Sequence, residues 1–393
     1  MKLKPKTTIE DFFGKIEDPR IERTKKHKLI DIITITICAV ICGADSWIDI
    51  ELFGKCKYKW LKKFLELPNG IPSHDTFARV FSLLEPEKLQ QSFLKWIESI
   101  SSLTQGEIVA IDGKTIRHSY DKSKDKSAVQ MVSAWATTNG LVLGQSIVDE
   151  KSNEITAIPD GQLTVRRATA HPCPQLLKVL SLSGCIVTID AIGCQKEIVK
   201  QITEQDADYV ITLKKNQVNL YEKVEALFKK ALINNFEGFI KSEYKVKDEG
   251  HGRQEVRYYQ MLSNVAEEID PDWQWLNLNS IGYVDYLRVE NGTDKTSLDR
   301  RYFISSLNNN IKLFSKAIRE HWCIENQCHW VLDVQFCEDD SRIRKDNAPA
   351  NIAILRHLGL NLLKQEKTQK VGVKAKRKKA GWDENYLLKV LSG

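Results

Sequence analysis

The stretch that organises this chain is His321-Trp322-Cys323-Ile324-Glu325-Asn326-Gln327-Cys328-His329-Trp330. Ile318, Trp322 and Val331-Leu332 recur at helical intervals, so the pattern predicts an amphipathic helix that carries Glu325 at its middle. A helical glutamate is usually exposed and salt-bridged. Glu325 becomes a candidate active-site carboxylate because two other segments each supply an acid that could meet it.

Two buried strands each deliver an aspartate. Ile108 to Ile111 lead into Asp112, and Cys185 to Ile189 lead into Asp190. Either pattern alone is weak, because an Asp after a buried strand is common in α/β enzymes and in turns. Three converging carboxylates are tolerable if they share cations, and hard oxygen ligands suit Mg²⁺ or Mn²⁺ rather than zinc. Two such ions about 3.5–4 Å apart can drive an in-line phosphoryl displacement, so we expect phosphodiester chemistry.

Length and composition limit the class of protein. The 393 residues favour two or three domains. The net charge is +6, with basic runs near both ends that favour a polyanion partner. Nine cysteines without a repeated Cys-x-x-Cys pair fit a reducing compartment. No secretory signal is recognisable, and Leu29 to Cys42 falls short of the roughly 20 apolar residues of a membrane span. We therefore expect a cytoplasmic protein without a membrane segment.

Residues 1–104 are expected to form a helical domain. Apolar stripes at helical spacing are separated by Gly43, Pro68-Asn69-Gly70 and Pro86. Short helices of this kind can be a helix-turn-helix DNA reader or a plain helical bundle. The basic entry to the first long helix favours DNA-backbone contact by Arg23, Lys25, Lys26 and Lys28.

Residues 105–393 are expected to form an α/β domain with a mixed sheet. Segments 128–138 and 141–148, joined at Asn139-Gly140, predict a hairpin. Strands and helices alternate from residue 185, and a β-rich insertion is expected at about 240–306 before the Glu325 helix. The basic run at about 364–380 is expected to be a solvated tail that either contacts phosphates or serves only solubility.

Several motifs together resemble the DDE transposases of bacterial insertion sequences, and specifically the H-repeat-associated proteins linked to Rhs elements. The resemblance covers about residues 10–364. The matching motifs are Asp112-Gly113-Lys114, Ile189-Asp190-Ala191 with Gly193-Cys194-Gln195, His321-Trp322 with Ile324-Glu325-Asn326, His329-Trp330, Leu332-Asp333-Val334, Asn153 to Pro159, Lys214 with Asn216-Gln217, and Gly250-His251-Gly252-Arg253.

The resemblance implies a ribonuclease-H-like core, interrupted by the β insertion and preceded by a helical transposase-associated domain. Asp112, Asp190 and Glu325 would then be the catalytic triad and would bind two Mg²⁺ or Mn²⁺ ions. The implied activity is cleavage and strand transfer of double-stranded DNA, at terminal inverted repeats and a target, by a homodimer on DNA. Further DNA contacts would come from the matched basic residues Lys114, Lys214 and Arg253.

One wider signature of related transposases is absent. They often place Tyr and Arg seven and four residues before this Glu, and Lys seven after it, where this chain has Ile318, His321 and Leu332. Arg319, Lys312 or Lys316 is expected to supply the phosphate contact instead.

Three further expectations compete with or qualify this interpretation. His321, Cys323, Cys328 and His329 are residue types that bind zinc, but helical spacing points Cys323 away from the others. A catalytically inactive, transposase-derived DNA-binding protein is the alternative function. Finally, Asp160 to Gln175 is expected to be an inserted surface loop, because its two prolines disfavour extending the following helix backward.

Overall fold

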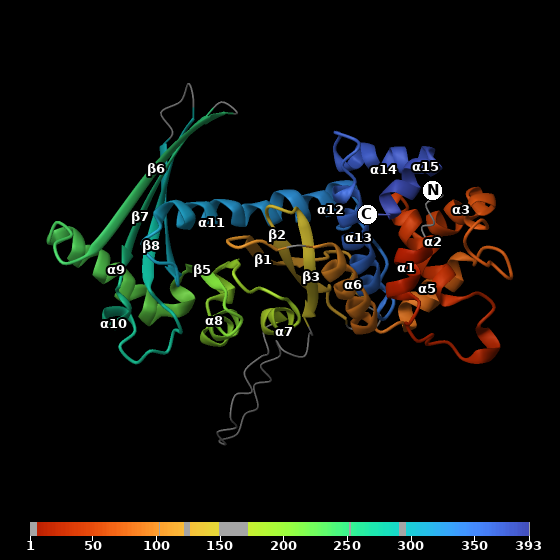
Figure 1. Cartoon of the computed structure of the whole chain (residues 1–393), viewed down its shortest axis with the longest axis horizontal. Helices are drawn as coiled ribbons and strands as arrows, with labels where there is room; N and C mark the ends of the chain where they lie inside the picture. Colours follow the sequence, from red (N-terminus) through yellow and green to blue (C-terminus); the bar gives the residue numbers. More distant parts are fainter. Residues whose placement is uncertain are drawn as a thin grey trace, which may run out of the picture.

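The computed structural model describes residues 6–101, 103–121, 126–148, 172–250, 253–290 and 296–392. Within them, the chain forms a group of helices, a nine-stranded sheet, and a long helix that crosses the sheet (Figure 1). None of the described helices is both long enough and apolar enough to cross a membrane.

The N-terminal part is helical, as expected. Its helices are α1 (Lys6–Phe13), α2 (Leu29–Ile41), α3 (Trp47–Cys56), α4 (Tyr58–Leu61), α5 (His74–Leu83) and α6 (Pro86–Ile100). α2 is buried on nearly all sides, which agrees with its continuous apolar sequence. A capping box of Ser46 and Asp49 starts α3, and Pro86 takes the first position of α6, where no intrahelical N–H bond is lost.

The central strands form a mixed sheet in the order β3-β2-β1-β4-β5. Their bounds are β1 (Ile108–Thr115), β2 (Gln130–Ala136), β3 (Leu141–Val148), β4 (Ile186–Ile189) and β5 (Asp208–Leu213). β1 pairs antiparallel with β2 and parallel with β4, and β5 is parallel to β4. This is the ribonuclease-H-like arrangement, so the expected fold class is confirmed.

Alternating side chains divide the sheet into two buried faces. Ile108, Ile186 and Val210 pack on one face, in a cluster with Phe314 and Ile318. Val109, Val187 and Ile211 pack on the other face, in the main core with residues of α7 (Pro172–Val179) and α8 (Lys196–Thr203). Because successive side chains of a strand point to opposite faces, every second residue of β1 and β4 faces the long helix.

The β insertion extends the same sheet. It contains β6 (Ile240–Gly250), β7 (Arg253–Ser263), β8 (Ser280–Glu290) and β9 (Thr296–Ser305), after α9 (Val218–Ile233) and with α10 (Ala266–Ile269) between β7 and β8. β9 pairs antiparallel with β5, and β8, β7 and β6 follow outward. Figure 1 shows β6, β7 and β8 continuing well beyond the central strands.

The expected Glu325 helix is present and is longer than the motif. α11 (Ile311–Ile324) continues through a π-helical turn (Glu325–His329) into α12 (Trp330–Gln335). Asn310 caps its start by accepting a hydrogen bond from the Leu313 amide. Figure 1 shows α11 running from the β insertion across β1 and β2 to the helices at the other end of the molecule.

The basic run near the C-terminus is folded, not a solvated tail. It belongs to the end of α13 (Ala348–Gln365) and to α14 (Val373–Trp382), which α15 (Glu384–Leu391) follows. The buried Lys376 ammonium donates to the Leu363 carbonyl at 2.9 Å, and the buried Arg377 donates to the Val40 carbonyl of α2 at 2.8 Å. These two cations bind main-chain carbonyls, so α14 packs on α13 and on the N-terminal helices.

The sequence predicts a surface loop at Asp160 to Gln175. Residues up to 171 of this segment lie outside the described part of the chain, and the prediction is wrong for the last four residues. Pro172 to Gln175 are the first residues of α7, which starts four residues earlier than Leu176. A proline is accepted in the first turn of a helix because the amide it lacks has no intrahelical partner there. Cys173 is fully buried, so this turn is part of the core.

Candidate active site

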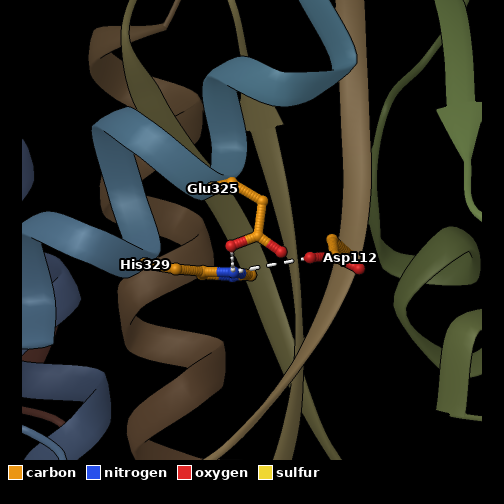
Figure 2. Close-up of side chains that lie close together, drawn as sticks. All are labelled: Asp112, Glu325 and His329. Carbon is orange, nitrogen blue, oxygen red and sulfur yellow. Dashed lines mark ion pairs between the residues drawn. The ribbon is translucent and has the colours of Figure 1, made fainter. Parts of the chain in front are cut away.

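Three side chains with metal-ligand atoms come together where α11 crosses β1. They are Asp112 of β1, and Glu325 and His329 from the two ends of the π-helical turn (Figure 2). His329 Nδ1 lies 3.5 Å from Asp112 Oδ2 and 3.7 Å from Glu325 Oε2. One ligand atom from each residue lies within 4.8 Å of the other two. The structure therefore brings together two of the three expected carboxylates.

Strand parity explains why Asp112 faces the helix. Asp112 lies four residues after Ile108 on β1, so the two side chains point to the same face of the sheet. The Ile108 side chain packs in the cluster with α11. The sequence predicts that β1 ends at this aspartate. Instead, β1 continues to Thr115, because its pairing with β2 extends that far. Asp112 is thus a residue inside a strand, where it is paired with Ser133 of β2.

The two carboxylates of the cluster bind protons with different strength. Burial is the main cause that raises the pKa of Asp112 to about 7, and the nearby Glu325 carboxylate adds to it. Glu325 is more exposed, and its interaction with His329 lowers its pKa to about 2. The His329 imidazole favours the charged form of both carboxylates, but burial makes Asp112 the one that keeps a proton more readily.

Asp190 directly follows β4 and lies outside the three-residue cluster. Ile111 of β1 is paired with Ile189 of β4, and Asp112 and Asp190 are the residues that follow this last pair. The Asp190 carboxylate accepts a hydrogen bond from the Ile192 amide at 3.1 Å and thereby caps the short turn Ala191–Gly193. Among the described residues, Asp190 is not part of the group whose ligand atoms all lie within 4.8 Å of one another.

His321 connects the Asp190 strand to the Glu325 helix. Its Nδ1 lies 3.0 Å from the Thr188 hydroxyl, and Thr188 has the parity of Asp190 on β4. Burial lowers the pKa of His321, while the charges of Asp190 and Glu325 oppose that change. His321 occupies the position where related transposases are expected to have arginine, and here it is a contact between helix and strand.

Asn216 and Gln217 hold the loop that follows Asp190. The Asn216 side-chain amide donates to the Ala191 carbonyl at 2.6 Å, and that of Gln217 donates to the Cys194 carbonyl at 2.8 Å. Both residues follow β5, the strand next to β4. In the sequence, these residues stand out only as part of a motif with Lys214; two amide side chains shortly after a buried strand are the signal of their structural role.

Lys114 is enclosed by carboxylates. It forms ion pairs with Asp333 and with the buried Glu338, the second at 2.6 Å. Burial would lower the pKa of Lys114, but the two carboxylates outweigh it and raise that pKa. Lys114 lies two residues after Asp112, so these ion pairs join the Asp112 strand to the chain that follows Glu325. This position differs from the exposed DNA contact expected for Lys114.

The other expected DNA contacts have different environments. Arg23 and Lys26 are exposed near the start of α2. Lys25 pairs with Glu22 at 3.1 Å and Lys28 pairs with Glu66 at 2.6 Å. Exposed side chains at the β5 end and on α11 are those of Lys214, Arg319, Lys312 and Lys316.

Arg253 begins β7, and its side chain lies outside the described part of the chain.

No cysteine joins the metal-ligand cluster among the described residues. Burial raises the pKa of the Cys328 thiol, and also that of Cys323, so both favour the protonated form that does not bind metal. The geometry thus agrees with the helical spacing in disfavouring a zinc site of His321, Cys323, Cys328 and His329.

Comparison with known proteins defines the class. A family model described as Transposase DDE domain matches residues 103–362, and one described as DDE_Tnp_1-associated matches residues 10–97. The chain belongs to the DDE transposase family.

Two curated relatives cover nearly the whole chain. The "Putative transposase YncI" of Escherichia coli O157:H7 is 42% identical over 98% of this chain and 94% of its own. The "H repeat-associated putative transposase YhhI" of Escherichia coli strain K12 is 40% identical over 96% of each. The resemblance to the H-repeat-associated branch is confirmed.

A solved structure, of a piggyBac transposase synaptic complex with hairpin DNA, aligns over 98% of this chain and 76% of its own at 12% identity and a TM-score of 0.40. The family assignment rests on the family models and the curated relatives.

Proposed function

We propose that this protein is an active transposase that cleaves double-stranded DNA at terminal inverted repeats and joins it to a target. The observation that carries the proposal is the meeting of Asp112 and Glu325, two residues far apart in sequence, at the crossing of β1 and α11. A buried carboxylate with a raised pKa beside another carboxylate is costly for the fold. Such a pair is typical of a site that binds cations.

The residues of the site fit divalent metal ions. Carboxylate oxygens from Asp112 and Glu325 are the hard ligands that Mg²⁺ and Mn²⁺ prefer. We assign Asp190 as the third ligand, because it follows Ile189, which is paired with Ile111, the residue before Asp112. Two bound ions would supply activation of the attacking oxygen and stabilisation of the leaving oxygen. The protein's own residues hold these carboxylates on two strands and one helix.

Other residues of this chain position the carboxylates. His321 joins the helix to β4 through Thr188, and Asn216 fixes the turn after Asp190. Lys114 fixes β1 to the segment after Glu325. We therefore assign Lys114 a structural role in the site instead of a DNA contact.

DNA is expected to bind along exposed basic residues. Arg23 and Lys26 near α2, Lys214 after β5 and Arg319 on α11 are exposed and can neutralise phosphates. Lys374 and Lys378, one helical turn apart on α14, are exposed too. We assign residues 1–104 a DNA-binding role and residues 105–393 the catalysis, on a homodimer.

The test is metal-dependent cleavage and strand transfer on DNA that carries the inverted repeats flanking the gene. Asp112→Asn, Asp190→Asn and Glu325→Gln should each reduce cleavage to background with Mg²⁺ or Mn²⁺, while binding of the repeat DNA stays near the wild-type level. Glu222→Gln, an exposed acid on α9, is the matched control and should cleave like wild type.

Full Mg²⁺-dependent activity in Glu325→Gln would refute the assignment of the triad. A wild-type protein that binds the repeats but cleaves none of them with either metal would instead identify a transposase-derived DNA-binding protein.

A further inference from the structure

His329 is a buried imidazole that points at the two carboxylates. Its side chain is 5% exposed, and Figure 2 shows a ring nitrogen facing the carboxylates of Glu325 and Asp112. His329 Nδ1 is 3.5 Å from one carboxylate and 3.7 Å from the other. An N–H···O hydrogen bond normally spans about 2.7–3.2 Å, so neither contact has the length of a well-formed bond.

The other ring nitrogen, Nε2, is buried and lacks a hydrogen-bond partner among the described residues. A histidine kept in a core for structural reasons is expected to be hydrogen-bonded, since a buried polar atom without a partner costs about 1–3 kcal/mol. The orientation of Nδ1 toward two carboxylates therefore needs an explanation other than packing.

We propose that His329 is a nitrogen ligand of the divalent ion that Asp112 and Glu325 bind. The proposal rests on the function proposed above and adds a residue to its metal site. It makes the site a mixed nitrogen and oxygen site instead of one built of carboxylates alone.

The spacing of the three side chains supports a shared ion. Bonds from such metals to imidazole nitrogen or carboxylate oxygen are about 2.0–2.2 Å long, so two ligands of one ion lie at most about 4.4 Å apart. The separations of 3.5 and 3.7 Å are within that limit. The π-helical turn that contains Glu325 and His329 is a second feature of the same place, and such turns occur frequently at functional sites.

A nitrogen ligand changes which metal the site prefers. Mg²⁺ is bound mostly through oxygen, whereas imidazole suits transition metals, which bind more tightly to a site that contains nitrogen. The protein should therefore bind Mn²⁺ more tightly than Mg²⁺, and His329→Gln should reduce that preference. Loss of one ligand should weaken Mn²⁺ binding by about tenfold or more, as loss of even an outer-sphere partner weakens metal binding about 10–100-fold.

The experiment is pulsed electron paramagnetic resonance of Mn²⁺ added to the full-length protein without DNA. Wild type should show coupling of Mn²⁺ to ¹⁴N of an imidazole, and His329→Gln should lose that coupling while it still binds Mn²⁺ in a calorimetric titration. His321→Gln is the matched control, because His321 is the other histidine beside the carboxylates, and it should keep the coupling. Circular dichroism melting checks that each variant is folded.

The wild-type spectrum tests the proposal even if His329→Gln does not fold. Bound Mn²⁺ without ¹⁴N coupling would overturn the role of His329 and leave the transposase function intact. Coupling that disappears in His321→Gln and persists in His329→Gln would also overturn it. Absence of Mn²⁺ binding at millimolar concentration would overturn both the proposed metal site and this inference.

Discussion

At the scale of single residues, the site depends on side chains that hold the carboxylates as well as on the carboxylates themselves. Asp112 is fixed within a paired strand, whereas Asp190 follows the last residue of β4 and relies on the turn after it. Asn216 is the residue that holds this turn, through its bond to the Ala191 carbonyl. A small displacement of a reacting group can lower a rate about 10²-fold, so under the proposed function we expect this single hydrogen bond to be important for cleavage.

We predict that Asn216→Ala lowers Mg²⁺-dependent cleavage about tenfold or more, because the Asp190 turn loses its anchor. The folding free energy should fall by only about 1 kcal/mol, the net value of one hydrogen bond. The measurement is the cleavage rate together with urea unfolding. Asn219→Ala, an exposed asparagine on α9, is the control and should change neither. Equal cleavage by Asn216→Ala and wild type would contradict the positioning role.

At the scale of elements, β1 and the Glu325 helix must keep a constant separation. Phe314 and Ile318 of α11 pack against one face of the sheet. Lys114 adds a directional contact, since it joins β1 to Asp333 of α12 and to Glu338. Glu338 also lies 4.0 Å from the buried Arg356 of α13. The network thus joins β1, the Glu325 helix and α13.

We predict that Lys114→Met destabilises the protein by about 3–5 kcal/mol, because it leaves the buried Glu338 carboxylate without its nearest cation. The double variant Lys114→Met/Glu338→Gln should lose less than the single variant, since no carboxylate remains unpaired at that position. Chemical denaturation of the two variants and of Glu338→Gln measures the coupling. A loss below about 1 kcal/mol for Lys114→Met would show that this ion pair does not hold the two elements together.

At the scale of the whole molecule, the two ends of the chain form one helical unit. Arg377 of α14 donates to Val40 of α2, lies 3.7 Å from Asp45, and stacks on Phe336 after the catalytic helix with its guanidinium carbon 4.1 Å from the ring centre. α14 therefore contacts both the N-terminal helices and the end of the Glu325 helix. Two of its lysines, Lys374 and Lys378, are exposed to solvent.

We predict that exposed lysines of α14 affect DNA binding and that a buried lysine affects thermal stability. Lys374→Gln/Lys378→Gln should leave the melting temperature unchanged and should reduce the slope of log affinity against log salt by about 1.8, since each lost phosphate contact changes that slope by about 0.9. Lys376→Met should lower the melting temperature, because Lys376 binds main-chain carbonyls at the end of α13. DNA-binding titrations at several salt concentrations, with thermal melting, measure both. An unchanged slope in the double variant would exclude α14 as a DNA contact.

The sequence alone determined the helical N-terminal part, the strands that carry Asp112 and Asp190, the β insertion and the helix around Glu325. These features follow from local periodicity, capping residues and turn residues, which act over a few positions and can be recognised without knowledge of distant contacts. The motifs also identified the family.

Only the tertiary structure decided which side chains share the site. His329 joins Asp112 through a crossing of helix and strand, and Lys114 is enclosed by Asp333 and Glu338. Lys376 and Arg377 are buried although their local sequence is typical of a solvated tail. The environment of a charged side chain depends on residues hundreds of positions away, because burial and ion pairing arise only when separate elements pack together.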